Sequence, residues 1–442
     1  MNWAGRFRIW ISQRAGAPRR EDPMAERSRF AIWADCSDLE QPQKFGEVVL
    51  SRQRGRRTAS FAFDDRWLER QDLRVIDPDL MPFRGPQYAK EGRTVFGFLA
   101  DSAPDRWGRL LMQRREAARA RTEERPVRHL DDYDYLLGVH DRARLGALRF
   151  SASDDGGFLA EDDPWATPPW TRLRELEAAA RAVDRPQGGD DDSRWLDIIF
   201  APGSSLGGAR PKASVRDDAG RLWIAKFPAH RDLVDVGAWE YLVHQLAGDA
   251  GLAVPIAQVQ RMTDAGTTFV VQRFDRTPDN RRIHFASAMT LLGRTDNDAR
   301  PTSYIDLAEA ITRYGERPTE DLAELWSRIV FSMAVSNFDD HLRNHGFLLG
   351  RHGWHLSPIY DVNPDPTGTG LSLAVTAGDN RPDFDLALSV SDYFGMSAAN
   401  ARNRMAEILG AVGHWRERAR HIGIPRHEVE QMAGAFRSTR RA

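Results

Sequence analysis

The sequence predicts an α+β protein of two lobes, the first rich in β-strands and the second helical, with an extra small α/β domain at the N-terminus. Up to about residue 286, short strand-like runs alternate with single helices and turn-forming clusters, whereas helical periodicity dominates afterwards. The polar residues suited to chemistry are divided in the same way. A Gly-rich loop and two lysines lie in the strand-rich part, and a cluster of Asp and Asn residues lies in the helical part. We therefore expect a functional cleft between the two lobes.

Composition narrows the class of protein. The 442 residues exceed what one hydrophobic core usually serves, so roughly two or three domains are expected. A formal net charge of -2 argues against a protein that coats nucleic acid. Cys36 is the only cysteine, which excludes a disulfide framework and a multi-cysteine metal site. No run approaches the roughly 20 apolar residues of a membrane span, and no signal peptide is expected because the apolar run near the N-terminus is short and interrupted by Arg. We expect a cytoplasmic protein.

The N-terminal part is predicted to contain a tail and a small domain. Residues 1–29 are rich in Arg, Pro and Gly without periodicity, so a disordered tail is expected. Residues 30–155 form the predicted α/β domain, and the Asp-, Gly- and Pro-rich stretch 151–169 is predicted to be a linker. The elements expected in the domain are strands at 30–33, 47–50, 60–63 and 147–150, and helices at about 104–121 and 133–139.

Residues 170–286 are predicted to form the strand-rich lobe. A helix at 171–183 and a polar loop precede the Gly-rich sequence GSSLGGAR, which begins at Gly203. Residues 273–276 are expected to leave the sheet. The other elements expected here are strands at 213–216, 222–227, 256–262 and 267–272, and a helix at about 234–248.

Residues 287–442 are predicted to form the helical lobe. Thr319 is expected to cap a helix with one apolar face, and this helix runs straight into Asn337. A hairpin of strands 347–349 and 354–356 is expected next, followed by helices at about 398–410, 413–421 and 427–436.

The stretch NFDDHLRNHGFLLGRHGWHLSPIYD contains the main chemical signal. Asp339 stands five residues before Asn344, and Asp361 follows the predicted hairpin. The same order of parts occurs in the catalytic loop of protein kinases. There, one carboxylate accepts a proton from the attacking hydroxyl, and an amide oxygen and a second carboxylate hold Mg²⁺. The spacing therefore indicates phosphoryl transfer.

Lysines give a second signal. The chain has 62 Lys and Arg residues, but its only lysines are Lys44, Lys90, Lys212 and Lys226. Lys212 and Lys226 fall within one 15-residue window just after the Gly-rich loop, where a compact ammonium is suited to bind phosphate. Glu240, on the next predicted helix, is a plausible ion-pair partner for Lys226.

Each signal also has a simpler interpretation. Most Gly-rich loops are turns, a lone Lys in a strand can reach solvent, and Asx residues often cap helices. Histidines near Asp339 and Asp340 allow a zinc site or a metal-dependent phosphohydrolase; these are His341, His345, His352 and His355. The order of all the parts favours a two-lobed, protein-kinase-like fold.

The motifs GSSLGGARPKA, WIAKFP, QRFDR, NFDDHLRNHGFL and SPIYDV resemble those of the HipA family, the toxin kinases of bacterial toxin–antitoxin pairs. The segments FGFLADSAPDRWGRLLMQRR and LGVHDRARLGALRF resemble the N-terminal domain of that family. The resemblance implies a serine/threonine-protein kinase that uses ATP and Mg²⁺, autophosphorylates its Gly-rich loop and takes part in bacterial persistence. It also implies a small DNA-binding antitoxin and a protein substrate such as an aminoacyl-tRNA synthetase or another translation factor. The alternative is an inactive relative that acts as a binding module or co-repressor.

The resemblance also assigns roles by motif. Asp339 would be the catalytic base, Asn344 and Asp361 would hold Mg²⁺, and Ser205, or else Ser204, would be autophosphorylated. The residues that would contact ATP are Gly203, Ser204, Ser205, Leu206, Gly207, Gly208, Lys212, Lys226, Gln272, Phe274, His341 and Asn344. Two positions depart from the family pattern, because Asp340 and Arg343 stand where a small residue and a Lys are common.

Overall fold

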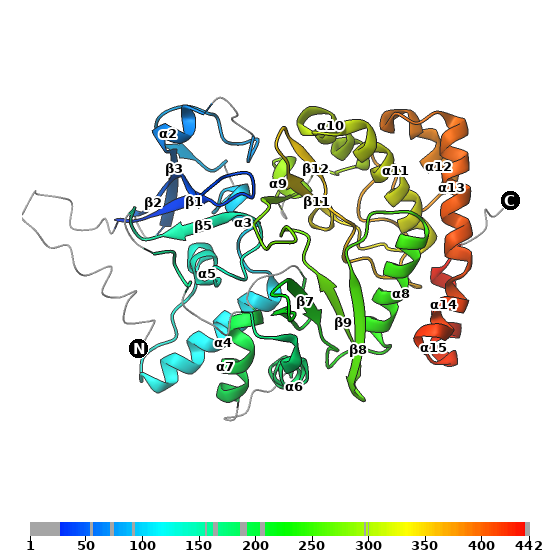
Figure 1. Ribbon diagram of the computed structural model, residues 1–442, viewed down its shortest axis with the longest axis horizontal. Coiled ribbons are helices and arrows are strands. Elements are labelled where there is room, and N and C mark those ends of the chain that lie inside the picture. The colour runs from blue at the N-terminus through cyan, green and yellow to red at the C-terminus, as the bar shows by residue number, and fades with distance from the viewer. Residues whose placement is uncertain are drawn as a thin grey trace, which may run out of the picture.

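The computed structural model describes residues 27–53, 56–70, 75–90, 93–154, 157–161, 167–185, 192–203, 208–295, 298 and 300–437. The tail expected over residues 1–29 lies almost wholly outside them. The described chain forms three antiparallel sheets surrounded by helices. In Figure 1 the five-stranded sheet lies at one end of the molecule, the four-stranded sheet near the middle, and the C-terminal helices at the other end.

The N-terminal sheet has the strand order β4-β3-β2-β1-β5. Its strands are β1 (Arg27–Ala34), β2 (Gln43–Gln53), β3 (Arg56–Phe63), β4 (Gln87–Tyr88) and β5 (Leu148–Ser151). Aromatic rings fill its inner face, where Phe98 meets Phe45 and Phe61 edge-on with centroids 5.6 and 5.4 Å away. The helices of this part are α2 (Asp65–Leu68), α3 (Gly97–Ala100), α4 (Arg106–Thr122) and α5 (Asp132–Gly138).

The four-stranded sheet has the order β6-β7-β9-β8. Its strands are β6 (Lys212–Arg216), β7 (Leu222–Lys226), β8 (Ala257–Thr263) and β9 (Gly266–Gln272). Helix α8 (Val236–Asp249) packs closely on β9 at Gly237, where an added Cβ would lie 2.0 Å from the carbonyl oxygen of Thr267. The close approach therefore depends on glycine at this position.

Helix α7 (Asp192–Gly203) is an element that the sequence did not predict. Leu196, Ile199 and Phe200 are buried on one face, at helical spacing. They share a hydrophobic cluster with α4, with α6 (Leu173–Asp184) and with the four-stranded sheet. Because α7 runs to Gly203, this glycine ends a helix, whereas the sequence predicted it to begin the Gly-rich loop.

The C-terminal part is helical around a small sheet of order β10-β11-β12. Its strands are β10 (Phe285–Ser287), β11 (Gly346–Leu349) and β12 (Trp354–Leu356). Its helices are α9 (Ala288–Leu291), α10 (Tyr304–Tyr314), α11 (Pro318–Ala334), α12 (Phe384–Ser389), α13 (Ala398–Gly413), α14 (Trp415–Ile422) and α15 (Arg426–Gln431), and its short 3₁₀ turns are η2 (Leu342–Asn344), η3 (Ser391–Phe394) and η4 (Met432–Ala435).

The start of α11 corrects one prediction. The sequence placed the N-cap at Thr319, but the helix begins at Pro318 with Arg317 as its cap residue. Proline suits the first helical position because its fixed φ matches the helix and its missing N–H is not needed there.

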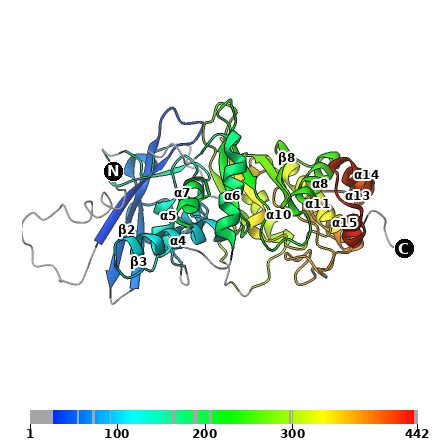
Figure 2. The ribbon, with the colours of Figure 1, turned by 90° about the horizontal axis from the view of Figure 1, so that it is seen from below.

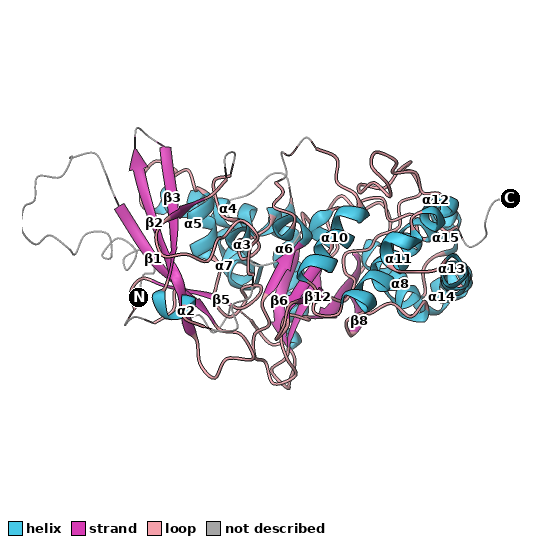
Figure 3. Ribbon diagram, turned by 90° about the horizontal axis from the view of Figure 1, so that it is seen from above, coloured by secondary structure: helices cyan, strands magenta, loops and turns pink. Residues whose placement is uncertain are grey.

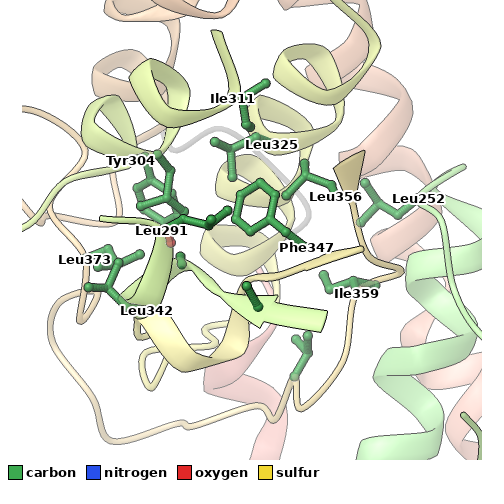
Figure 4. Close-up of a cluster of buried hydrophobic side chains, with 14 of the residues drawn as sticks. Leu252, Leu291, Tyr304, Ile311, Leu325, Leu342, Phe347, Leu356, Ile359 and Leu373 are labelled. Atoms are coloured by element: carbon green, nitrogen blue, oxygen red, sulfur yellow. The ribbon is translucent and has the colours of Figure 1, made fainter. Parts of the chain in front are cut away.

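A hydrophobic core lies behind the segment that follows α11. Figure 4 shows Phe347 of β11 among side chains from α10, α11 and η2, with Leu342 and Leu373 on one side and Leu356 and Ile359 on the other. This packing holds the polar residues of the segment between Leu342 and Phe347 in place.

The views in Figures 2 and 3 place the N-terminal strands and the C-terminal helices at opposite ends of an elongated molecule. The predicted α+β class is confirmed. None of the helices in the described ranges has the length and apolar content of a membrane span.

Candidate functional site

Lys226, the last residue of β7, is the centre of the candidate site. Its Nζ lies 2.5 Å from Oε1 of Glu240 on α8 and 2.7 Å from Oδ1 of Asp361, which follows β12. The sequence predicted the pair with Glu240 and expected Asp361 in the facing lobe. One ammonium thus joins the strand-rich lobe to the helical lobe.

Burial and charge act against each other at these three groups. Burial lowers the pKa of Lys226, but the neighbouring charges of Asp361 and Glu240 outweigh it and raise that pKa. Burial also disfavours the carboxylate of Asp361, yet Lys226 and Lys212 lower its pKa to about 2. For Glu240, burial dominates and raises the pKa of the carboxyl. Lys226 and Asp361 are therefore held as a charged pair.

Lys212 and Gly208 lie on the other side of Asp361. Lys212 opens β6 with its side chain only 3% exposed, and its Nζ lies 3.0 Å from Oδ2 of Asp105. Gly208 has a φ of +96°, and a Cβ there would lie 3.2 Å from Lys212 Nζ and 3.9 Å from Asp361 Oδ2. Glycine thus keeps open the space between the end of the Gly-rich loop and these charges. The predicted loop residues Ser204, Ser205, Leu206 and Gly207 lie outside the described residues.

The predicted catalytic loop is a tight turn. The side chain of Asp339 is exposed, and its backbone carbonyl accepts hydrogen bonds from Asn344 Nδ2 at 2.9 Å and from the backbone N–H of His341 at 3.0 Å. Asn344 is buried at the end of η2. The segment from Asp339 to Asn344 therefore folds back on itself. The hydrogen bond from Asn344 Nδ2 to the Asp339 carbonyl also fixes the plane of the Asn344 amide.

Asp340 points into the core although Asp339 is exposed. Its carboxylate accepts hydrogen bonds from the hydroxyl of Tyr304 and from Ser332 Oγ at 3.2 Å, and it lies 2.9 Å from Nε2 of His345. His345, Tyr304 and Ser332 are all buried. Asp340 therefore anchors the loop and does not add a second carboxylate beside the predicted base.

The histidines and aspartates that suggested a zinc site do not come together in the part of the chain that the structure describes. Asp340 and His345 pair in the core, Asp339 is exposed, and His352 lies exposed in the turn between β11 and β12. Across the described ranges, no group of three His, Cys, Asp or Glu residues could hold a metal ion. The hard oxygen donors of Asn344 and Asp361 nevertheless suit Mg²⁺, which prefers carboxylate, amide and phosphate oxygens.

Phe274 and Tyr360 form an aromatic contact at the junction of the lobes. Their ring centroids lie 5.4 Å apart, and the Tyr360 hydroxyl donates to the backbone carbonyl of Arg343 at 2.6 Å. Gln272 ends β9 just before this contact, opposite Trp223 on β7. Arg343 itself is exposed, and its backbone carbonyl supports the Tyr360 hydroxyl.

Three residues near the site were not predicted. Asp105 binds Lys212, and Asp101 accepts hydrogen bonds from Ser287. His244 lies one turn after Glu240 on α8, and its pKa is lowered by burial and by the nearby charge of Lys226. The sequence offered one usable signal, because Asp is a favoured N-cap residue and Asp105 caps α4, which begins at Arg106 and not at 104 as predicted.

A protein-family model described as the HipA-like C-terminal domain matches residues 204–441. Two curated relatives match shorter segments. "Putative kinase" of Haemophilus influenzae is 31% identical over 124 residues, and "Putative kinase Y4dM" of Sinorhizobium fredii is 27% identical over 159 residues. These segments are 25% and 33% of this chain but only 36% and 38% of the relatives' own lengths.

A solved complex of the toxin–antitoxin proteins HipA and HipB of Shewanella oneidensis with their operator DNA contains a similar chain. The likeness has a TM-score of 0.64 at 16% identity and covers 92% of this chain and 94% of that one. It shows that the fold is the two-lobed, kinase-like α+β fold with an extra N-terminal domain, as predicted. Because the family model covers more than half of the residues, this chain belongs to the family with a HipA-like C-terminal domain.

Proposed function

We propose that this chain is an ATP- and Mg²⁺-dependent protein serine/threonine kinase that acts as the toxin of a bacterial toxin–antitoxin pair. The observation that carries the proposal is Lys226, whose ammonium joins Glu240 of one lobe to Asp361 of the other. Active protein kinases hold the corresponding Lys–Glu pair and a metal-binding Asp in the same cleft. The proposal also rests on membership of a family whose relatives are named as kinases.

Each polar group then has a role that suits its position. Asp339, whose carboxylate is exposed, accepts the proton of the attacking hydroxyl. Asn344 and Asp361 would hold Mg²⁺, which offsets the negative charge of the phosphates. Lys226 and Lys212 bind phosphate oxygens beneath the loop that ends at Gly208. The remaining proposed ATP contacts are Gly203, Ser204, Ser205, Leu206, Gly207, Gln272, Phe274 and His341.

We propose that autophosphorylation of the Gly-rich loop turns the kinase off, with Ser205 as the first choice and Ser204 as the second. A phosphate there adds about two negative charges where the ATP phosphates bind, and the repulsion weakens nucleotide binding. Mass spectrometry after prolonged incubation with ATP tests this step, with Ser205→Ala as the comparison. An unmodified loop with falling activity contradicts it.

The partners follow from the same proposal. The structural relative is in complex with HipB and operator DNA, which supports a small DNA-binding antitoxin as the partner. The substrate would be a protein of translation, such as an aminoacyl-tRNA synthetase. The alternative function, an inactive co-repressor, requires antitoxin binding without phosphoryl transfer.

The decisive experiment measures ADP binding and label transfer from γ-labelled ATP with Mg²⁺. Wild type and Asp279→Asn, an exposed control, should bind ADP and incorporate label. Asp339→Asn should bind ADP but transfer no label, and Asp361→Asn should lose transfer as well. Binding without transfer by wild type favours the co-repressor. No nucleotide binding by wild type contradicts the proposal, and phosphate release from a monoester without ATP favours a phosphohydrolase.

A further inference from the structure

Residues 101–105 connect α3 to α4 and pass from one lobe of the kinase fold to the other. We call them the interlobe segment. They lie in the N-terminal domain, and none of them is among the residues proposed to bind ATP or to take part in catalysis. Their two ends carry carboxylates, Asp101 and Asp105, and each binds a different lobe.

Asp101 holds the helical lobe. Its carboxylate accepts hydrogen bonds from the backbone N–H of Ser287 at 2.8 Å and from Ser287 Oγ at 2.7 Å. Thr290 Oγ1 donates to the carbonyl of Gly97 at 3.0 Å, one turn earlier. Ser287 ends β10 and caps α9, so this end of the segment is tied to the sheet beside the proposed catalytic loop.

Asp105 holds the strand-rich lobe at Lys212. Its Oδ2 lies 3.0 Å from Lys212 Nζ, and Trp107 Nε1 donates to the backbone carbonyl of Lys212 at 3.0 Å. Between the two ends, Arg144 Nη1 donates to the carbonyl of Ser102 at 2.9 Å. The segment is therefore fixed at both ends and in the middle.

The charges at Lys212 give the segment a link to the nucleotide site. Lys212 is nearly fully buried, and a buried ammonium needs a counter-ion. Asp105 supplies this counter-ion. The Lys212 ammonium also lies beside Gly208, and its charge lowers the pKa of Asp361. Burial raises the pKa of Asp105 against the attraction of Lys212, and the charge of Asp361 raises it further. Several carboxylates thus compete for two ammonium groups.

We propose that Asp105 is a positioning residue that holds Lys212 in the nucleotide-free protein and competes with the nucleotide phosphates for its charge. This inference rests on the proposed function. In the nucleotide-free protein Asp105 is the counter-ion of Lys212, and phosphate groups entering beside Gly208 share that role. Removal of the Asp105 charge should therefore weaken the fold but strengthen phosphate binding.

The experiment compares Asp105→Asn with wild type by thermal unfolding and by calorimetric titration with Mg·ADP. Asn remains a good N-cap for Gly108, so α4 keeps its start while the charge is lost. The variant should unfold at a lower temperature without nucleotide, and it should bind ADP at least about fivefold more tightly. Its KM for ATP should fall without a rise in kcat.

Two further variants separate charge coupling from a structural effect. Asp64→Asn changes another N-cap aspartate of the N-terminal domain and should leave ADP affinity unchanged. In a Lys212→Met background, Asp105→Asn should no longer change ADP affinity. Unchanged or weaker ADP binding by Asp105→Asn, or an equal effect with and without Lys212, overturns the inference. Failure of wild type to bind ADP instead overturns the proposed function.

Discussion

At the level of single residues, the adjacent Asp339 and Asp340 have opposite environments. The family resemblance assigned the role of base to Asp339, but the sequence could not tell which way the neighbouring Asp340 points. The answer depends on His345 and on Tyr304, which lies 36 residues before Asp340, because both pack against the buried carboxylate of Asp340. Spacing along a chain shows which residues are near in sequence, but it does not show which way each side chain points.

Asp340→Asn should therefore destabilise the protein, whereas Asp339→Asn should not. Replacing Asp340 breaks a buried, hydrogen-bonded network and should lower the free energy of unfolding by about 2–4 kcal/mol. Asp339 is exposed, so its replacement should change the free energy of unfolding by no more than about 0.5 kcal/mol. Urea denaturation measures both values.

Tyr304→Phe is the matched control, because it keeps the ring and removes only the hydroxyl that donates to Asp340. It should cost about 1–3 kcal/mol as a buried acceptor loses a donor. Equal stability of the Asp340→Asn and Asp339→Asn variants would show that Asp340 does not anchor the loop.

The pair of Asp361 and Lys226 predicts a pH dependence of stability. The pKa of Asp361 is lowered from 3.8 to about 2, so its folded value lies below its unfolded value. The pair's contribution is therefore present above about pH 4 and is lost as the pH falls towards 2. A shift of this size corresponds to about 2 kcal/mol.

Urea denaturation of wild type and Asp361→Asn between pH 2.5 and pH 7 measures this contribution. The stability difference between the two proteins should be largest above about pH 4 and should shrink as the pH falls. A difference that stays constant across this range contradicts the assignment.

At the level of elements, the sequence predicted those with a clear period or a clear boundary. The helix expected at 234–248 is observed at Val236–Asp249, and the hairpin after the Asp/Asn cluster is observed at β11 and β12. Helix α7 was missed because it begins in an Asp-rich stretch and ends at Pro202 and Gly203, which usually interrupt helices. Its burial against α4 and α6 comes from tertiary packing, which local sequence does not reveal.

Gly237→Ala should move α8 away from β9. An added Cβ would lie 2.0 Å from the carbonyl oxygen of Thr267, which is backbone and cannot turn aside. Overpacking of this kind should cost about 1–3 kcal/mol. Because Glu240 lies one turn later on the same helix, the shift should also separate Glu240 from Lys226 and weaken Mg·ADP binding.

Gly248→Ala is the control on the same helix. The added Cβ would lie 3.4 Å from Val254 Cγ2, an ordinary contact, and alanine should stabilise the helix by about 0.5–1 kcal/mol. Thermal unfolding and ADP titration measure both variants. If Gly237→Ala behaves like Gly248→Ala, the approach of α8 to β9 does not determine the position of Glu240.

At the level of the whole molecule, the N-terminal domain is joined to the kinase lobes by a buried charge cluster. Asp275, just after β9, binds Arg273 at 2.6 Å, Arg276 at 2.6 Å and the backbone N–H of Gly146 at 2.8 Å. Arg273 in turn donates to the carbonyl of Ala143 at 2.7 Å. The motifs QRFDR and LGVHDRARLGALRF were both noted in the sequence. Their contact was not predicted, because ion pairing between segments about 130 residues apart leaves no local pattern.

Asp275→Ala should weaken the contact between the N-terminal domain and the strand-rich lobe. Burial disfavours the carboxylate of Asp275, but Arg273 and Arg276 outweigh it and lower its pKa far below its usual range. Its removal leaves two buried guanidinium groups without their partner, which should cost about 3–5 kcal/mol. Because Gly146 also loses its acceptor, protection of residues around β5 from amide hydrogen exchange should fall as well.

Asp279→Ala is the control, since Asp279 is exposed in the turn after this cluster. This substitution should lower the free energy of unfolding by no more than about 0.5 kcal/mol. Urea denaturation gives the stabilities, and hydrogen exchange shows where protection is lost. If Asp275→Ala loses protection from hydrogen exchange only in the four-stranded sheet, the cluster stabilises that lobe alone. Loss of protection in both the N-terminal domain and the four-stranded sheet would mean that the two fold as one cooperative unit, because residues 273–276 are hydrogen-bonded to the N-terminal domain and directly follow β9.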